Sequence, residues 1–288
     1  METNDQQIRN EASSPTANVK LKEQQYANAD KFKARIHLHA AFSTNPYPWP
    51  CWVLDQIEPA AQSPQILELG CGNGLLWMVN ADRIPADWKL TLSDFSQGML
   101  DSARHNLQNI DKPIQFEVID AGHIDYSDHS FDIIIANHML YHLPNRVQAL
   151  LEIHRILKPG GIFYASTIGL NNMAEMKLLL REFDADSDYE RMLGNIESHF
   201  SLDNGAEQLQ QVFEAVQLRR YDNSLRITDP EAILNYVLSY NGMEADTRVL
   251  APEKTELFKA FIEEKISRQG SISITIDSGL FISTSALS

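Results

Sequence analysis

The sequence predicts an α/β fold in which a mostly parallel sheet carries helices on both faces. Between residues 65 and 167, short apolar segments with strand character alternate with segments whose apolar residues recur at helical spacing. One strand segment, Gln65–Leu69, runs directly into a glycine-rich turn, Gly70–Gly74, after which a helix begins. Such alternation is typical of parallel sheets, because a parallel neighbour can be reached only through a long crossover connection.

Length and composition limit the classes of protein that remain. The chain has 288 residues, enough for one large domain or one domain with an elaboration. It carries 24 Lys and Arg against 39 Asp and Glu, a formal net charge of −15, which disfavours nucleic acid and anionic membranes as partners. The two cysteines, Cys51 and Cys71, are too few for a disulfide framework. The first residues lack a signal-peptide pattern, so we expect a soluble, cytoplasmic protein.

The N-terminal region is polar at first and then helical. Residues 1–20 have no apolar periodicity and predict a mobile leader. Leu21–Phe42 has a helical pattern, and Asn45–Pro50, with three prolines, predicts an irregular connector.

Five strands are expected before residue 170. They are Gln65–Leu69, Lys89–Ser93, Ile114–Ile119, Phe131–Ala136 and Gly161–Thr167. The helices expected between them are Leu75–Ala81, Ser96–Leu107 and Arg146–Leu157. The last of these helices should stop at Lys158–Gly161, whose Pro-Gly-Gly pattern terminates helices.

Helical patterns dominate beyond Gly169. The expected helices are Asn172–Phe183, Asp186–Ile196, Pro230–Tyr240 and Pro252–Arg268. Val216–Ile227 predicts a long strand, and Ser271–Ser285 predicts a β-hairpin that turns at Asp277-Ser278-Gly279.

The glycine-rich turn is the feature most typical of a ligand site. Its glycines allow a tight turn and let a ligand approach backbone N–H groups at a helix N-terminus. A dinucleotide fingerprint needs glycines at positions one, three and six, and the sixth position here is Leu75. Glu68 precedes the turn, where its charge would repel a pyrophosphate. We therefore expect a ligand that is cationic at this end.

Glu68–Gly74 resembles the first motif of class I S-adenosylmethionine (SAM)-dependent methyltransferases, and the resemblance continues in order from Ile66 to Thr167. It implies a Rossmann-like fold with a seven-stranded sheet, parallel except for the last strand. It also implies an N-terminal helical lid at 21–60, a SAM-binding core at 61–170, a helical substrate-recognition insertion at 171–215, and strands and helices at 216–288 that complete the sheet. Within this class the chain is most similar to the methyltransferase-11 group, which includes quinone C-methylating and carboxyl O-methylating members.

The resemblance implies SAM as the cofactor and assigns residues to it. Asp94, at the end of the second strand, would accept hydrogen bonds from the ribose hydroxyls, and Phe95 and Met99 would sandwich the adenine. Asp120 and Ala121 would read the edge of the adenine. The other implied contacts are Glu68, Gly70, Cys71, Gly72, Asn73, the backbone carbonyl of Asn137 and, from the lid, Tyr26.

Two of these assignments have a structural alternative. Cys71 lies inside the cofactor turn, where a small space-filling side chain is expected rather than a nucleophile. Tyr26 and Trp52 are candidate lid contacts, although aromatic residues at helical spacing more often belong to a core.

The segment Asn137–Pro144 follows the fourth strand, and ligands of open parallel sheets bind beyond the carboxyl ends of strands. His142 is the first candidate for a general base, because the unperturbed imidazole pKa lies near 6.5. Tyr141 and His138 are weaker candidates, and a substrate contact or a structural role is the alternative for His142. His138 and His142 have the spacing of a helical metal pair, but no Asp, Glu or Cys nearby completes a site, so no metal is expected.

The same segment lacks motifs of methyltransferases that act on nucleic acids. It has Asn-His-Met-Leu where enzymes acting on exocyclic base amines carry Asn/Asp-Pro-Pro-aromatic, and it has no Pro-Cys nucleophile. With the acidic charge, this favours a small-molecule acceptor that is methylated on O, N or C. A catalytically silent SAM-binding scaffold and an NAD(P)-dependent oxidoreductase are the alternatives. In the predicted insertion, Arg181 and Arg191 either meet an anionic acceptor or pair with Glu182 or Glu190.

Overall fold

The computed structural model describes residues 29–59, 61–242 and 247–286. Its seven-stranded sheet has the order β3-β2-β1-β4-β5-β7-β6. The strands are β1 Gln65–Leu69, β2 Lys89–Asp94, β3 Ile114–Val118, β4 Phe131–Asn137, β5 Leu157–Ile168, β6 Ala215–Ile227 and β7 Ile272–Thr284. Neighbouring strands are parallel except where β7 pairs with β5 and with β6. The predicted sheet, parallel except for its last strand, is therefore confirmed.

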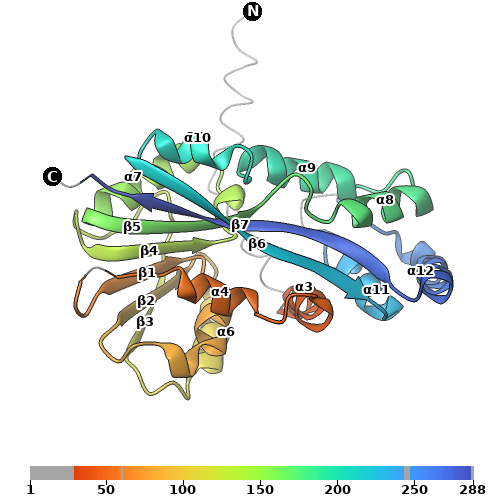
Figure 1. The fold of residues 1–288 in the computed structure, drawn as a ribbon, viewed down its shortest axis with the longest axis horizontal. Coiled ribbons are helices and arrows are strands. Elements are labelled where there is room, and N and C mark those ends of the chain that lie inside the picture. The colour runs from red at the N-terminus through yellow and green to blue at the C-terminus, as the bar shows by residue number, and fades with distance from the viewer. Residues whose placement is uncertain (1–28, 60, 243–246, 287–288) are drawn as a thin grey trace, which may run out of the picture.

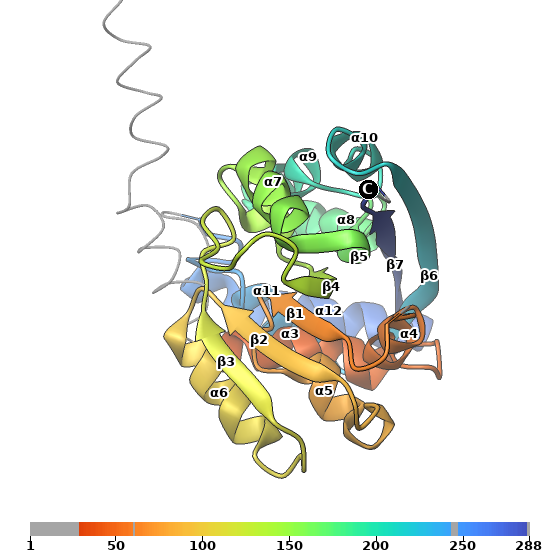
Figure 2. The same ribbon diagram turned by 90° about the vertical axis from the view of Figure 1, so that its left-hand side faces the viewer.

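Helices cover both faces of this sheet, as predicted (Figure 2). The helices are α4 Trp49–Asp55, α5 Leu75–Val79, α6 Gln97–Leu107, α7 Arg146–Ile156 and α10 Gly205–Gln210. Alternate residues of a strand point to opposite faces, so Leu67 joins the apolar cluster under α7 and α10, whereas Ile66 joins the cluster under α4, α5 and α6. Because both faces are buried, the central strands are apolar almost throughout.

A second lobe with its own apolar core lies beside the sheet. Its helices are α3 Ala29–Phe42, α8 Ala174–Phe183, α9 Tyr189–His199, α11 Pro230–Leu238 and α12 Thr255–Gln269. β7 pairs with β5 only over Ser278–Thr284, but it pairs with β6 along its whole length. The two strands therefore leave the sheet as a ribbon that runs into the second lobe (Figure 1). Short 3-10 turns are η1 Ala81–Arg83, η2 Leu140–His142 and η3 Pro252–Lys254.

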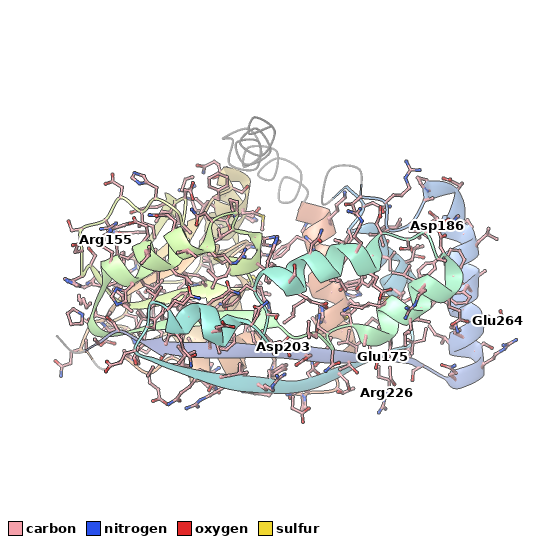
Figure 3. All side chains as sticks on the ribbon, turned by 90° about the horizontal axis from the view of Figure 1, so that it is seen from above. Arg155, Glu175, Asp186, Asp203, Arg226 and Glu264 are labelled. Atoms are coloured by element: carbon pink, nitrogen blue, oxygen red, sulfur yellow. The ribbon has the colours of Figure 1, made fainter. Side chains whose placement is uncertain are left out.

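Glu175, at the start of α8, ties this lobe to the ribbon. Its carboxylate accepts hydrogen bonds from the backbone N–H and the hydroxyl of Thr275 on β7, both at 2.7 Å. Figure 3 shows Glu175 at this junction, between the sheet and the outer helices. Within the predicted insertion at 171–215, α8 and α9 share one apolar core with α11 and α12, whereas Phe200, Leu209 and Phe213 pack against the sheet.

The predicted hairpin at Asp277-Ser278-Gly279 is wrong. These residues lie in the middle of β7, opposite Asp222, Tyr221 and Arg220 of β6. A Cβ on Gly279 would lie 2.7 Å from the carbonyl oxygen of Arg219. The glycine therefore marks a close approach between backbones, which has the same local sequence signature as a turn.

Two other expectations differ at element boundaries. The connector Asn45–Pro50 is shorter than predicted, because α4 already begins at Trp49, and Pro50 lies in its first turn, where a missing N–H costs no hydrogen bond. The strand expected at Gly161 begins at Leu157, so the Pro-Gly-Gly segment both ends α7 and enters β5. The predicted leader at 1–20 and the start of the first helix lie outside the described residues.

The close backbone contact at Gly279 predicts that a side chain at this position lowers the stability of the fold. Gly279→Ala should destabilise the fold by about 1–3 kcal/mol, because the new methyl group meets backbone as well as Leu202 and Leu218. Gly194→Ala is the matched control, since nothing lies within 4 Å of its Cβ position on α9. It should stabilise by about 0.5–1 kcal/mol. Urea unfolding of both variants measures the difference, and equal midpoints would contradict the packing described.

Candidate active site

The glycine-rich turn lies at the carboxyl end of β1. Gly70, Gly72 and Gly74 all have φ in the left-handed region, at +69°, +58° and +78°. A Cβ on Gly70 would lie 2.9 Å from the Cβ of Met139, so a larger residue would meet both strain and a clash. The turn thus brings backbone close to the loop that follows β4.

Glu68, two residues before the turn, is a buried carboxylate held by two donors. Its side chain accepts hydrogen bonds from the indole N–H of Trp77 at 2.6 Å and from the Asn137 amide at 3.2 Å. The side-chain amide oxygen of Asn137 in turn accepts a hydrogen bond from the Ser166 hydroxyl at 3.1 Å. Burial raises the pKa of Glu68 to about 7 despite these donors, and nearby Asp94 adds to the rise. A cation bound beside Glu68 would favour its ionised form.

Asp94 connects the turn to the end of β2. Its carboxylate accepts hydrogen bonds from the backbone N–H of Gly72 at 3.0 Å and of Ser96 at 2.8 Å. A carboxylate offers roughly four acceptor sites, so one such side chain can accept several hydrogen bonds at once.

The other predicted cofactor residues are distributed as follows. Phe95, Asp120 and Ala121 line the same cavity as Glu68 and Asp94. Met99 is buried on α6 and lines a smaller neighbouring pocket instead. Tyr26 lies outside the described residues.

Cys71 and Asn73 complete the turn. Burial raises the pKa of the Cys71 thiol well above its usual value, so the thiol stays protonated, in keeping with a space-filling role. The side-chain oxygen of Asn73 is buried and has no hydrogen-bond partner within the described part of the chain. An unpaired buried acceptor is costly, and a ligand donor would relieve it. Together with three carboxylates and the glycine turn, it fits a cationic nucleoside such as SAM.

These residues open into one cavity of about 860 Å³ between the strand ends and the second lobe. This volume is within the roughly 300–1,000 Å³ of small-molecule sites. We call the part beyond the glycine turn the acceptor chamber. It is lined by Arg35, His39, Trp49, His138, Tyr141, His142, Asn172, Leu193, Ile196, Tyr221, Tyr236, Tyr240, Ile276 and Ser278.

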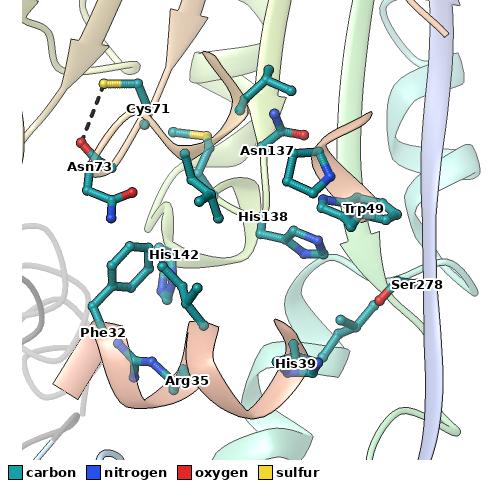
Figure 4. A pocket seen from close by; sticks show the side chains of 18 of the residues that line it. Phe32, Arg35, His39, Trp49, Cys71, Asn73, Asn137, His138, His142 and Ser278 are labelled. Atoms are coloured by element: carbon teal, nitrogen blue, oxygen red, sulfur yellow. Dashed lines mark hydrogen bonds between the residues drawn. The ribbon is translucent and has the colours of Figure 1, made fainter. Parts of the chain in front are cut away.

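Three imidazoles face the acceptor chamber (Figure 4). Burial lowers the pKa of His39 and of His138 to about 4, and that of His142 to about 3. All three are therefore neutral at pH 7, and each is a weaker proton acceptor than a free histidine. The role of His142 as a base, with Tyr141 as an alternative, stays a prediction that this environment does not favour.

His138 is also conformationally unusual. It has φ of +48°, and its backbone N–H donates to the hydroxyl of Ser166 at 3.0 Å. Its ring lies 5.2 Å from that of Trp49, between centroids. A non-glycine residue in the left-handed region costs energy and is common in functional sites.

Among the residues considered from the predicted lid and insertion, some line the cavity and others do not. Trp49 lines the cavity, whereas Trp52 stacks on it at 5.2 Å and packs into the core beneath α4. Arg181 and Arg191 lie outside the cavity lining and pair with Glu190 at 3.7 Å and Asp188 at 2.9 Å. Both arginines therefore form ion pairs on the surface, which was the alternative to contact with an anionic acceptor.

Several chamber residues were not singled out from the sequence as a group. Tyr221, Tyr236, Tyr240 and Ile276 come from β6, the α11 region and β7, far apart in the chain. From the sequence alone, Arg35 is one of several polar positions on a predicted helix, and nothing distinguishes it from the others. Nothing local to those segments signals that the second lobe closes over the strand ends.

Two further findings concern metal ions and membranes. In the ranges that the structure describes, no three or more His, Cys, Asp and Glu side chains are grouped so as to hold a metal ion. None of the described helices is long and apolar enough to cross a membrane.

Residues 67–165 match the family model of a methyltransferase domain. This match and the seven-stranded sheet with acids at its strand ends support a methyltransferase domain of the class I fold, a class whose cofactor is SAM. The matched residues comprise β1 to most of β5, and so exclude the elements that close the acceptor chamber.

Within the class, the chain is similar to the demethylmenaquinone methyltransferase of Lactobacillus johnsonii. The two are 40% identical over 97 residues, which are 33% of this chain and 40% of that protein. The chain therefore aligns with less than half of that relative's length.

Two solved structures share the fold over a longer stretch. Phosphoethanolamine N-methyltransferase 2 of Haemonchus contortus, in complex with S-adenosyl-L-methionine, matches 95% of this chain and 61% of its own, with a TM-score of 0.59 and 16% identity. The YcgJ protein of Bacillus subtilis matches 82% of this chain and 97% of its own, with a TM-score of 0.54 and 17% identity.

The environment of Glu68 predicts pH-dependent binding of SAM. Below pH 7 the carboxyl group is protonated and must release its proton to face the cationic ligand. Affinity should therefore rise by up to about tenfold per pH unit as pH increases towards 7, and level off above it. Calorimetric titration with SAM between pH 5.5 and 8 measures the affinity of the wild type and of Glu68→Gln. The affinity of each protein is compared with its own affinity at pH 8. An equal pH dependence in both proteins would refute it.

Proposed function

We propose that this protein transfers a methyl group from SAM to an oxygen, nitrogen or carbon atom of a small molecule held in the acceptor chamber. The observation that carries the proposal is the cavity that joins the strand-end acids to a largely aromatic chamber. When bound, SAM supplies a methyl group on a positively charged sulfur, which is already activated for displacement. The tasks left to the chain are binding, alignment and exclusion of water.

We assign cofactor binding to the residues at the strand ends. Asp94 would accept hydrogen bonds from the ribose hydroxyls, and Asp120 and Ala121 would face the adenine, with Phe95 against its ring. Glu68 lies deepest, at 2% exposure, where its charge would offset that of the cofactor. The backbone carbonyl of Asn137 and the open acceptor of Asn73 would take donors of the ligand.

The volume of the cavity supports an acceptor of limited size. Trp49 of α4 and Tyr221 of β6 both line it and meet with ring centroids 5.3 Å apart. A cavity of this size and the acidic net charge both favour a small molecule over a nucleic acid, and we expect the reaction to occur in the cytoplasm.

The alternatives differ in what they need from the site. An NAD(P)-dependent enzyme would place a pyrophosphate at the glycine turn, next to the buried acids Glu68 and Asp94. A silent SAM-binding scaffold would need no chamber beyond the cofactor. The chamber therefore favours a transferase.

Asp94 provides the direct test of the proposed site. Asp94→Asn should weaken SAM binding roughly 10–100-fold, because a hydrogen bond to a charged group contributes about 1.5–3 kcal/mol. Asp111→Asn, an exposed substitution of the same kind, should leave binding unchanged. Calorimetric titration with SAM measures both variants, and an unaltered affinity in Asp94→Asn would remove the site assignment.

Activity is tested with SAM labelled on the methyl group and a mixture of small metabolites. Label should move into small molecules with the wild type and at a much lower rate with Asp94→Asn. NADH should not raise the thermal midpoint, whereas SAM should. Tight SAM binding without any labelled product would contradict the proposed transferase and support the silent SAM-binding scaffold.

A further inference from the structure

One wall of the cavity is formed by the ribbon of β6 and β7. Tyr221 and Asn223 of β6 lie opposite Ser278 and Ile276 of β7, and all four residues line the cavity. They form one patch, because residues two apart on a strand share a face and paired residues of neighbouring strands lie side by side on it. Asn172, between β5 and α8, also lines the cavity. We call these five residues the ribbon wall.

Two asparagine side chains of the ribbon wall have a fixed orientation. The amide oxygen of Asn223 accepts hydrogen bonds from the Ser43 hydroxyl at 2.9 Å and from the backbone N–H of Asn45 at 3.1 Å. The amide oxygen of Asn172 accepts a hydrogen bond from the backbone N–H of Asp277 at 3.2 Å. A backbone N–H only donates, so the side-chain atom that faces it is the oxygen. In both side chains the NH₂ group is therefore turned away from these contacts.

The ribbon wall holds three hydrogen-bond donors that lack an acceptor. Neither of the two NH₂ groups nor the hydroxyl of Ser278 has a hydrogen-bond partner among the residues that the structure describes. Asn172 and Ser278 are 7% and 8% exposed, and an unpaired buried donor is costly. Asn223 is a diagonal neighbour of Ser278 across the two strands, and Asn172 binds the backbone of the residue before Ser278. The three donors therefore surround one place in the cavity.

This place lies at the end of the cavity opposite the glycine turn, and α3 connects the two ends. The Phe32 ring comes within 3.6 Å of a Cβ position on Gly72, whereas Ser43, directly after the helix, donates to Asn223. Roughly ten residues of helix separate these two points, a rise of about 15 Å. Figure 4 likewise shows Ser278 across the cavity from Phe32. A ligand group at the ribbon wall is thus remote from the strand-end acids.

Aromatic and apolar side chains line much of the chamber between these ends. The Trp49 ring lies 5.2 Å from the ring of His138, which follows β4, and 5.3 Å from the ring of Tyr221 on the ribbon. Leu193 and Ile276 also line the chamber. A ligand that fills the chamber therefore needs an apolar middle and, at the ribbon wall, atoms that accept hydrogen bonds.

We propose that the ribbon wall binds one or two carbonyl oxygens of the methyl acceptor, at the end of that molecule remote from the methylated atom. The NH₂ groups of Asn172 and Asn223 and the hydroxyl of Ser278 donate hydrogen bonds to the oxygens of a ketone, ester or amide. These residues select the acceptor molecule and take no part in the transfer itself. The inference rests on the proposed function, because it describes a second contact of the same substrate.

Other polar groups suit these donors less well. An ammonium group presents hydrogens to them, so donors on both sides would stay unpaired. An anion would be buried against two amides and a hydroxyl, which carry no charge to offset its loss of water. A carbonyl oxygen accepts two hydrogen bonds and is uncharged, so neutral donors satisfy it.

The first experiment compares ketones with molecules of the same skeleton, using the full chain saturated with S-adenosylhomocysteine. Each ketone of a panel, for example 4-phenylbutan-2-one, is matched with the hydrocarbon in which CH₂ replaces the carbonyl and with the amine at the same carbon. Titration followed by ligand-observed NMR measures the affinities. The ketones should bind roughly tenfold more tightly than both partners, because the donors stay unpaired without a carbonyl oxygen. Equal or weaker binding of the ketones throughout the panel would overturn the inference.

Asn223→Asp separates the donor from the oxygen of the same side chain. The new carboxylate still accepts hydrogen bonds from Ser43 and Asn45, so the fold should be retained, whereas the NH₂ group is lost. Affinity for the ketone should fall roughly tenfold, and affinity for the hydrocarbon should stay within about twofold. If both affinities fall alike, Asn223 has only a structural role and the inference is wrong.

Ser278→Ala tests a second donor without removing a hydrogen bond within the described part of the chain. It should lower affinity for the ketone about three- to tenfold and leave the hydrocarbon unaffected. Asn145→Asp is the matched control, because the Asn145 amide oxygen also accepts from a backbone N–H, that of Gln148 at 3.2 Å, and Asn145 lies outside the cavity lining. It should change neither affinity.

Affinity for S-adenosylhomocysteine distinguishes the remaining outcomes. Asn223→Asp and Ser278→Ala should both bind it as the wild type does. Weaker binding of S-adenosylhomocysteine in these variants, with an unchanged ratio of ketone to hydrocarbon affinity, would assign the donors to the cofactor and overturn the inference. Failure of the wild type to bind S-adenosylhomocysteine would instead contradict the proposed function.

Discussion

The antiparallel pairing of β6 with β7 is the interaction on which the remainder of the structure depends. Both strands have 13 residues, and they stay paired from the sheet into the second lobe. The same ribbon completes the sheet beside β5, carries the apolar core of the outer helices, and provides Tyr221 and Ser278 to the cavity. Without this pairing the strand ends would open to solvent, and the site would lack its far wall.

The acids that line the cavity between the two lobes lie at the strand ends. The cofactor half holds three acids, and one of them, Glu68, is buried deeply enough that its pKa rises to about 7. Burying a carboxylate is costly, and Trp77, Asn137 and Ser166 offset the cost through a chain of hydrogen bonds. Such an arrangement suits a ligand whose own positive charge completes the ion pair.

The proposed methyl transfer depends on how the site holds its two ligands. Displacement at an activated methyl group depends mainly on alignment, so rigid walls contribute more than proton transfer does. The aromatic contacts of Trp49 with His138 and Tyr221 fix three elements against one another at the place where alignment matters. The left-handed backbone at His138 fits the same interpretation, because local strain is held in place by surrounding packing.

The sequence by itself determined the order of strands and helices in the cofactor half, the glycine turn, and the acids Glu68, Asp94 and Asp120 at the strand ends. These features follow from local physics: periodicity of apolar residues, the φ freedom of glycine, and the position of a residue at the end of a strand. Only the tertiary structure decided that Asp277-Ser278-Gly279 is mid-strand and that Arg35, Tyr221 and Tyr240 meet at one chamber. Those outcomes depend on pairing and docking between segments distant in the chain, where the same residues that favour a turn also permit close backbone contact.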